Sequence, residues 1–340
     1  MSATDEDYVH MSVQALKTIG PLPKPLTDLD WLLIGELQTD GRISYGALAK
    51  TLGLPEATVQ RRVQQLIDQG YFKIVCFVDP MRIAPGHAVI VGLQCEPHAI
   101  QAVADAVAAV PEMRFVAMVT GTYDIVCELV TFDRLTTTDL LISSIGAIPG
   151  IRSMNTSRVL ANYRTAWRWD ALQRGQREHA APAAPPAHRE ERLLLDDLDH
   201  GIIRLLQEDG RISYQQLATR MGTTISTARR RALRLFASGY VKVVALGNPF
   251  RLGFDEVVLL WLQVDLAQTP DVIHALEQEP SIRYLSRMAG SVDIFAEAFF
   301  PNRAALLQFL DGPLSRIAGI RQVALSFELV IRKRGYTVFE

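Results

Sequence analysis

The hexapeptide Asp40-Gly41-Arg42-Ile43-Ser44-Tyr45 occurs twice in this chain of 340 residues, returning as Asp209-Gly210-Arg211-Ile212-Ser213-Tyr214. The same offset of 169 residues relates Gly70-Tyr71 to Gly239-Tyr240 and Gly121 to Gly290. One constant offset, kept without a gap over about 130 residues, predicts a tandem duplication rather than one shared motif.

The residues around the hexapeptide predict three short helices in each copy. In the first copy a helix opens at Asp28-Leu29-Asp30, Ser44 caps a second helix, and Gly53 provides the turn after it. A third helix is expected from about Glu56 to Gln69, with a glycine behind it. The strand-forming stretch Phe72–Val78 follows and is predicted to form a wing hairpin.

The rest of each copy predicts strands and helices in the order β-α-β-β-α-β, which is the ferredoxin-like arrangement. The fold class is therefore α+β, with two tandem units that each join a winged helix-turn-helix to a ferredoxin-like domain. The expected elements of the first copy are 88–95, 97–110, 114–119, 125–131, 135–145 and 151–160. Those of the second copy are 257–264, 270–278, 282–288, 294–300, 304–317 and 320–331.

These patterns divide the chain into six parts. A Pro- and Ala-rich stretch around Ala181–Pro186 buries little apolar surface, so it predicts an exposed linker between the copies. The predicted parts are an N-terminal extension (1–26), a first helix-turn-helix (27–80), a first α/β domain (81–162), the linker (163–195), a second helix-turn-helix (196–249) and a second α/β domain (250–340).

The composition is that of a folded protein, with 49% hydrophobic and 21% charged residues. No apolar run is long enough to cross a bilayer, and the first residues lack a secretory signal, so we expect a cytoplasmic protein without a membrane partner. The three cysteines lie in apolar surroundings without metal-ligand spacing and are expected to be buried. A net charge of −2 does not exclude nucleic acid, because DNA binding needs only a local basic face.

The third helix of each copy is the candidate recognition helix. Thr224–Ser238 holds four arginines and no acid, a local charge of +4, whereas the charges of Pro55–Gln69 cancel. Basic side chains neutralise phosphates, and short polar side chains at the helix start reach bases or phosphates. The alternative is a solvated charged helix face. The candidate DNA-binding residues are Thr58, Gln60, Arg61, Arg62, Thr224, Ser226, Thr227, Arg229, Arg230, Arg231 and Arg234. This asymmetry predicts more phosphate contacts from the second copy.

A turn between two central strands is the second candidate site in each copy. Its sequence is Thr120-Gly121-Thr122-Tyr123-Asp124 in the first copy and Ala289-Gly290-Ser291-Val292-Asp293 in the second. Glycine permits a positive φ there, and the aspartate can accept from a ligand amine or from backbone N–H groups. Spacing alone leaves a ligand site and a plain capped β-turn both open.

The motifs of catalytic sites are missing from the sequence. No H-E-x-x-H, phosphate-binding loop, dinucleotide fingerprint or nucleophilic serine elbow occurs. Glu128 and Glu297, at strand centres, are expected to face solvent or an interface rather than to form an acid/base pair. We therefore predict no catalytic residues, no metal and no cofactor.

At this point the chain resembles the Lrp/AsnC (leucine-responsive, feast/famine) regulators. The opening pattern L-D…L-Q-x-D-G-R-x-S-x-x-x-L-A stands at residues 29–49 and again at 198–218. The recognition-helix pattern T-V-x-x-R-V stands at 58–63, and the wing ends in Asp79-Pro80 or Asn248-Pro249. The family's G-x-Y-D motif is intact at 121–124, whereas Val292 replaces the tyrosine in the second copy.

The resemblance implies a DNA-binding transcriptional regulator whose α/β effector domains pair sheet to sheet. It implies double-stranded DNA as partner, homo-oligomers formed through these domains, and a small effector, commonly an amino acid. The effector-binding residues that it implies are Thr120, Gly121, Tyr123, Asp124, Gly290 and Asp293. The usual member has one unit and a capping serine before the recognition helix, where this chain has Pro55 and Thr224.

Two other classes of function stay in view. Sirohaem decarboxylases resemble the same architecture, but they carry a different strand where this chain has Tyr123–Cys127 and lack so regular a D-G-R-x-S motif. An effector-binding module without DNA binding conflicts with the arginine-rich second helix. The sequence leaves open the effector, the operator, the sign of regulation, and whether the effector domains pair within or between chains. It predicts a division of labour, with sensing weighted to the first unit and DNA binding to the second.

Overall fold

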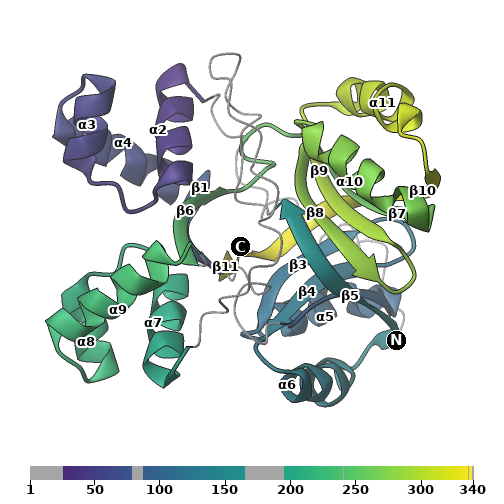
Figure 1. Ribbon diagram of the computed structural model, residues 1–340, viewed down its shortest axis with the longest axis horizontal. Coiled ribbons are helices and arrows are strands. Elements are labelled where there is room, and N and C mark those ends of the chain that lie inside the picture. The colour runs from purple at the N-terminus through teal and green to yellow at the C-terminus, as the bar shows by residue number, and fades with distance from the viewer. Residues whose placement is uncertain (1–25, 79–86, 165–194, 240, 336, 339–340) are drawn as a thin grey trace, which may run out of the picture.

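The computed structural model describes residues 26–78, 87–164, 195–239, 241–335 and 337–338. The predicted N-terminal extension lies almost entirely outside these residues, as does the predicted linker apart from its two ends. Each copy contributes one helical head, one strand behind it and one α/β half (Figure 1).

Both heads contain the three predicted helices. The first head consists of α2 (Asp28–Thr39), α3 (Tyr45–Leu52) and α4 (Glu56–Asp68), and the second of α7 (Asp197–Glu208), α8 (Tyr214–Met221) and α9 (Ile225–Ala237). The Ser44 side chain accepts from the Ala47 N–H, and Gly53 ends α3 at φ 66°. These caps confirm the predicted start and end of the second helix.

The strand behind each head pairs with its counterpart in the other copy. Strands β1 (Phe72–Val78) and β6 (Val241–Gly247) form an antiparallel two-stranded ribbon in which Phe72 lies opposite Gly247. The predicted wing hairpin is therefore wrong for Phe72–Val78, although the strand itself is confirmed. The β-branched and aromatic residues that predict a strand do not identify its partner, which here lies one repeat away.

The α/β halves confirm the predicted ferredoxin-like order. The first half contains β2 (His87–Cys95), α5 (Ile100–Ala108), β3 (Met113–Val119), β4 (Ile125–Thr131), α6 (Arg134–Asp139) with a π-helical extension (Leu140–Ile145), and β5 (Ile151–Arg164). The second contains β7 (Glu256–Val264), α10 (Thr269–Gln278), β8 (Ile282–Ala289), β9 (Ile294–Phe300), α11 (Arg303–Asp311), β10 (Ile320–Arg334) and the short β11 (Thr337–Val338).

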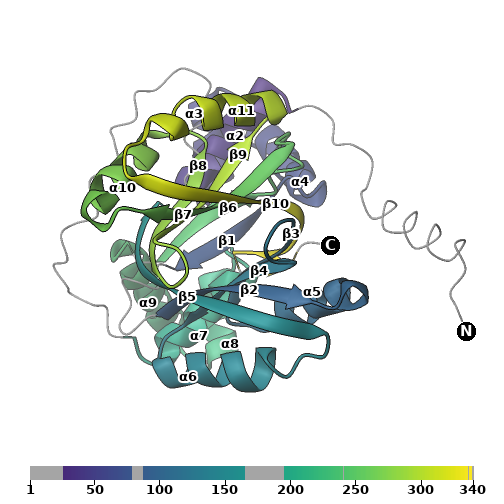
Figure 2. The ribbon, with the colours of Figure 1, turned by 90° about the vertical axis from the view of Figure 1, so that its right-hand side faces the viewer.

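The two α/β halves close into one barrel of strands within the chain. Strand β5 pairs with β2 of its own half and with β8 of the other, and β10 pairs in the same way with β7 and β3. Both fourth strands run past their predicted ends, to Arg164 and Arg334, because their last residues form these pairings. Figure 2 shows α5, α6, α10 and α11 on the outside of this barrel, which consists of β2–β5 and β7–β10 and is called the sensor barrel below. The sheet-to-sheet pairing expected of effector domains is thus satisfied inside one chain.

Each head packs on both ribbon strands, its own and that of the other copy. The core of the first head includes Ala245 of β6 and, beyond it, Leu252, whereas the core of the second includes Cys76 and Val78 of β1. The exchange joins the two heads and the ribbon in one continuous body (Figure 1). No helix in the described part of the chain is long and apolar enough to span a membrane.

Candidate nucleic-acid interface and sensor turns

Helix α4 presents Arg61 to solvent but uses Arg62 internally. The Arg62 Nε and Nη2 atoms donate to the Asp30 carboxylate of α2 at 2.5 and 2.6 Å, and that carboxylate is fully buried. Burial alone raises the pKa of Asp30, but hydrogen bonds from Arg62 and Thr27 outweigh it and hold the pKa below its usual value. Arg62 therefore joins α4 to α2, whereas Arg61 has no ion-pair partner among the described residues.

Helix α9 repeats this arrangement with two arginines. Arg231 and Arg234 both bind the buried Asp199 of α7, and Arg231 also contacts Asp196 at 2.8 Å. Arg229 and Arg230 are exposed, and no carboxylate in the described part of the chain pairs with them. Of the four positive charges of α9, two face carboxylates of its own head, so the predicted excess over α4 falls to two unpaired arginines against one.

The polar residues at the start of the two recognition helices differ. Pro55 caps α4 without a side-chain hydrogen bond, leaving Thr58 half-buried and Gln60 exposed. In α9 the Thr224 hydroxyl accepts from the Thr227 N–H and lies within hydrogen-bond distance of the hydroxyls of Ser226 (3.0 Å) and Thr227 (2.9 Å). The predicted contact residues thus lie together at each helix start, and the second set is ordered by its own cap.

The second candidate sites, called the sensor turns below (residues 120–124 and 289–293), are each capped by their aspartate. Oδ2 of Asp124 accepts from the Cys95 N–H at 2.8 Å, and Oδ2 of Asp293 accepts from the Val264 N–H at 2.9 Å. Each aspartate thereby ties its turn to the end of the neighbouring strand, β2 or β7. These contacts match the capped β-turn that the sequence left open. One oxygen of each carboxylate, Oδ1, is not used in these bonds.

The tyrosine of the first turn and the valine of the second reflect an exchange of large and small residues. Tyr123 lies on Gly92, where a Cβ atom would come within 2.6 Å of its ring. In the second unit, Trp261 occupies the position that corresponds to Gly92 and Val292 the position of Tyr123, so the large side chain comes from the strand. The two aromatic rings meet at 5.4 Å between centroids. In the second unit the Trp261 ring thus fills the space of the missing tyrosine ring, but no hydroxyl replaces that of the tyrosine.

Both turns are attached across the interface between the two units, but the first has a side-chain hydrogen bond there that the second lacks. The Thr120 N–H donates to the Phe327 carbonyl of β10, and the Thr120 hydroxyl accepts from the Phe327 N–H at 3.1 Å. Ala289 replaces Thr120 in the second turn and has no hydroxyl to offer. The asymmetry of the sensor turns therefore includes one side-chain hydrogen bond to the opposite half of the barrel.

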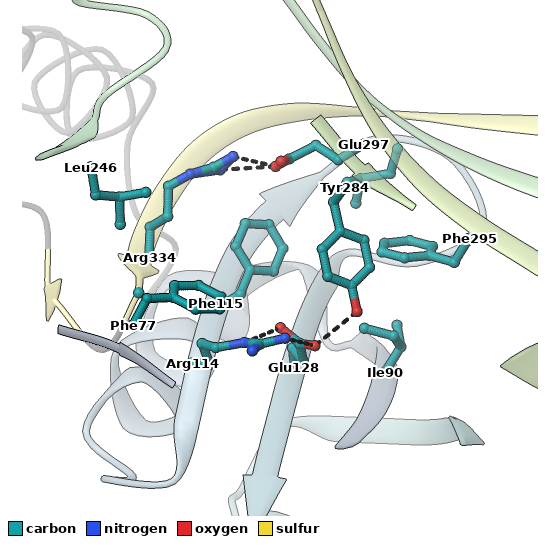
Figure 3. A pocket seen from close by; sticks show the side chains of 12 residues that line it. Phe77, Ile90, Arg114, Phe115, Glu128, Leu246, Tyr284, Phe295, Glu297 and Arg334 are labelled. Atoms are coloured by element: carbon teal, nitrogen blue, oxygen red, sulfur yellow. Dashed lines mark hydrogen bonds and ion pairs between the residues drawn. The ribbon is translucent and has the colours of Figure 1, made fainter. Parts of the chain in front are cut away.

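Buried ion pairs lie where the ribbon meets the barrel. Arg114 binds Glu128, the Tyr284 hydroxyl of the other unit donates to Glu128 at 3.0 Å, and Arg334 binds Glu297 (Figure 3). They surround a cavity of about 40 Å³ that is otherwise lined by apolar and aromatic side chains. The two glutamates thus face the interface, one of the two expected environments, while Arg114, Tyr284 and Arg334 lack any local sequence signal.

The remaining expectations concern cysteines and metals. All three cysteines are buried, as predicted, and burial raises the pKa of Cys95 to about 11. Among the described residues no cluster of histidine, cysteine, aspartate or glutamate has the arrangement of a metal site.

The chain is therefore a two-headed helix-turn-helix protein, in which both heads are attached to one α/β barrel. The model of the AsnC-type helix-turn-helix domain matches residues 26–67 and 195–235, and that of the Lrp/AsnC ligand-binding domain matches 88–166 and 257–338. The chain belongs to the Lrp/AsnC family of transcriptional regulators, as a tandem duplicate.

Individual relatives match one unit at a time. An uncharacterised HTH-type transcriptional regulator of Pyrococcus abyssi is 34% identical over 143 residues, which cover 42% of this chain and 90% of that protein. The leucine-responsive regulatory protein of Salmonella typhimurium is 29% identical, covering 41% and 93%. The structure of the siroheme decarboxylase NirDL matches both units with a TM-score of 0.59, covering 91% of this chain and 93% of that one. Its identity is 12%, so the likeness concerns the fold alone.

Proposed function

We propose that this chain is a sequence-specific regulator of transcription that binds double-stranded DNA through α4 and α9. The observation that carries the proposal is the pairing of β1 with β6, which holds two exposed recognition helices in one body. Arg61, Arg229 and Arg230 supply positive charge free of protein carboxylates among the described residues, and phosphate contacts of this kind provide affinity without sequence preference. Thr58, Gln60, Ser226 and Thr227, at the starts of the two helices, are the residues we propose to contact base edges.

We further propose that a small effector, an amino acid, modulates DNA binding through the sensor turns. The Asp124 carboxylate keeps an oxygen that is not used in its bond to Cys95, and Gly121, at φ 102°, forms the turn beside it. A carboxylate at such a turn suits the amino group of an amino acid. Gly290 and Asp293 form the corresponding site in the second unit, without a counterpart of the Thr120 hydroxyl bond.

The test is footprinting of the full chain upstream of its own gene and the neighbouring genes, with and without a panel of amino acids. We expect one protected region whose occupancy falls with salt and changes with one amino acid. If no promoter is protected at low salt, DNA binding is not the function. A protected region that ignores every amino acid would remove the effector part alone.

The enzyme alternative has the fold of NirDL in its favour. A pocket of about 550 Å³ lies between the heads beside Arg42 and Tyr214, but the cavity between the α/β halves is too small for a tetrapyrrole. Pockets that enclose drug-sized ligands measure roughly 300–1,000 Å³, whereas the cavity between the units measures about 40 Å³. A tetrapyrrole is larger than such a cavity. Purified protein that acquires a Soret band with sirohaem and shifts no DNA would favour the enzyme.

Assembly of several chains is a further part of the proposal. The π-helical segment after α6 leaves Ile142 exposed, and Leu135 of α6 is 76% exposed. Apolar residues left in solvent at the outside of the sensor barrel suit contact between chains. Sedimentation velocity tests this, and Leu135→Asp together with Ile142→Asp is expected to shift the protein toward the single chain.

A further inference from the structure

The repeated hexapeptide forms the contact between the two heads. Arg42 Nη1 and Nη2 donate to the carbonyls of Gly210 and Ile212, at 2.7 and 3.1 Å. Arg211 returns the contact, because its Nε and Nη2 donate to the carbonyls of Gly41 and Ile43 at 2.9 and 3.1 Å. Each copy of the motif therefore holds the backbone of the other copy.

The other residues of the motif prepare this contact. Asp40 Oδ1 accepts from the Arg42 N–H at 2.8 Å, and Asp209 does the same for Arg211, so each arginine leaves a fixed turn. The tyrosines that end the motif receive the guanidinium of the opposite arginine, Arg211 lying 4.5 Å from the Tyr45 ring centre and Arg42 lying 5.4 Å from that of Tyr214.

The glycines bring the two motifs close to the ribbon. The Gly41 N–H donates to the Val243 carbonyl at 2.8 Å, and a Cβ atom on Gly41 would approach that backbone to 2.9 Å. Gly210 lies against Ile74 of β1 in the same manner, with its N–H 3.3 Å from the carbonyl. Both motifs thus sit on the ribbon strand of the other copy, with the arginine pair between the heads.

We infer that Arg42 and Arg211 are positioning residues that fix the spacing and orientation of the two recognition helices, and hence the spacing of the DNA half-sites that the chain accepts. The inference rests on the proposed DNA binding. Planar guanidinium groups that donate two bonds each to backbone carbonyls define direction as well as distance. A lysine keeps the charge but not the two-pronged geometry. Replacing arginine by lysine therefore tests positioning separately from electrostatics.

The first experiment measures head geometry without DNA. Spin labels at Gln60→Cys and Arg229→Cys report the distance between α4 and α9, and the labelled parent chain serves as blank because its three cysteines are buried. We expect one narrow distribution in the chain that carries only the two label sites, and a distribution about twice as wide when Arg42→Lys/Arg211→Lys is added. Arg220→Lys, which alters an exposed pair with Glu208 inside one head, is the matched control and leaves the width unchanged.

The second experiment measures spacing. About 5 base pairs inserted between the half-sites rotate one half-site by half a turn of DNA. We expect the parent to lose at least about tenfold in affinity and the double lysine variant less than about threefold, since each mismatched contact is worth a factor of this order. Should the double variant not fold, Arg42→Lys alone retains the Arg211 half of the contact and is expected to show an intermediate loss.

The outcomes separate the two claims. An unchanged distance width, or an unchanged spacing profile, in the folded double variant overturns the positioning role of the arginines. A parent chain that binds no DNA overturns the proposed function and with it the spacing role, even where the label distances broaden. Broader distances together with a flatter spacing profile support the inference.

Discussion

Arg62 of the recognition helix α4 and Asp30 of α2 form a two-pronged ion pair in which the carboxylate is fully buried. Its neighbour Arg61 points to solvent. Arg61 and Arg62 are adjacent in α4 but have different roles. Arg62 pairs inside the head, and Arg61 lies on its surface. We therefore expect Arg62 to contribute mainly to the stability of the head and Arg61 mainly to its affinity for DNA.

Arg62→Ala is expected to lower the free energy of unfolding by about 2 kcal/mol, because it leaves the buried Asp30 carboxylate without its strongest donor. Arg61→Ala is expected to leave stability unchanged while reducing the salt slope of DNA binding by about 1. Denaturant unfolding and binding titrations at several salt concentrations measure both. Equal effects of the two variants on stability would contradict the assignment.

The same ion pair predicts a dependence on acid. The pKa of Asp30 in the folded head lies below its usual value, so the pair contributes stability above the unfolded pKa. That contribution is lost as the pH falls from about 4 through the folded pKa. The free energies of unfolding of the parent and of Asp30→Asn, plotted against pH, are expected to converge in acid and to diverge toward neutral pH. A difference that stays constant with pH would argue against the pair.

In the second head, Arg229→Ala/Arg230→Ala is expected to reduce the salt slope by about 2, whereas Arg231→Ala/Arg234→Ala mainly lowers stability. The reason is that Asp199 already binds the latter two arginines. The measurement is the slope of log K against log salt for each double variant, with circular dichroism as a check on folding. A larger slope change from the second pair than from the first would refute this division.

The two sensor turns are expected to respond unequally to the same substitution. Asp124→Ala removes a bond to Cys95 from the turn that Thr120 also attaches to β10, and we expect it to abolish the effector response. Asp293→Ala breaks the corresponding bond to Val264 in the turn where Ala289 and Val292 replace Thr120 and Tyr123, and we expect a smaller loss. Effector titrations of DNA binding decide the matter, and equal losses would argue against a division of labour.

The exchange between Gly92 and Trp261 predicts a specific coupling. Gly92→Ala places a methyl group against the Tyr123 ring and is expected to cost about 1–3 kcal/mol of stability. In a Tyr123→Ala background the same substitution is expected to be nearly neutral, because the space is then free. A double-mutant cycle measures the coupling energy, and additive effects would show that the ring is not the obstacle.

The fold could be predicted where the signal is local. The caps at Ser44 and Gly53 define helix ends within a few residues, and the strand Ile125–Thr131 needs only its own composition. The partner of Phe72–Val78 was missed because a lone strand sequence fits a hairpin and a distant strand equally well. The extended ends of β5 and β10 were missed for the same reason, since their partners belong to the other unit.

The candidate sites were predictable in position but not in division of roles. The sequence identifies α9 as basic, yet Asp199, which neutralises two of its arginines, lies about thirty residues earlier on another helix. Likewise, Arg42 and Arg211 are visible as a repeated motif, but no local feature indicates that each binds the backbone of the other motif, at Gly210 and Ile212 or at Gly41 and Ile43. Contacts between residues distant in sequence require the three-dimensional structure.

The ribbon of β1 and β6 has one more consequence. A regulator assembled from two identical chains carries the same recognition helix twice, so the symmetry of the protein demands a palindromic operator. Here both ribbon strands belong to one chain, and the helices they hold differ at nearly every exposed position. Given the proposed DNA binding, duplication within a single polypeptide lets the two half-sites of the operator differ in sequence. Dilution cannot separate the two recognition helices, because one chain carries both.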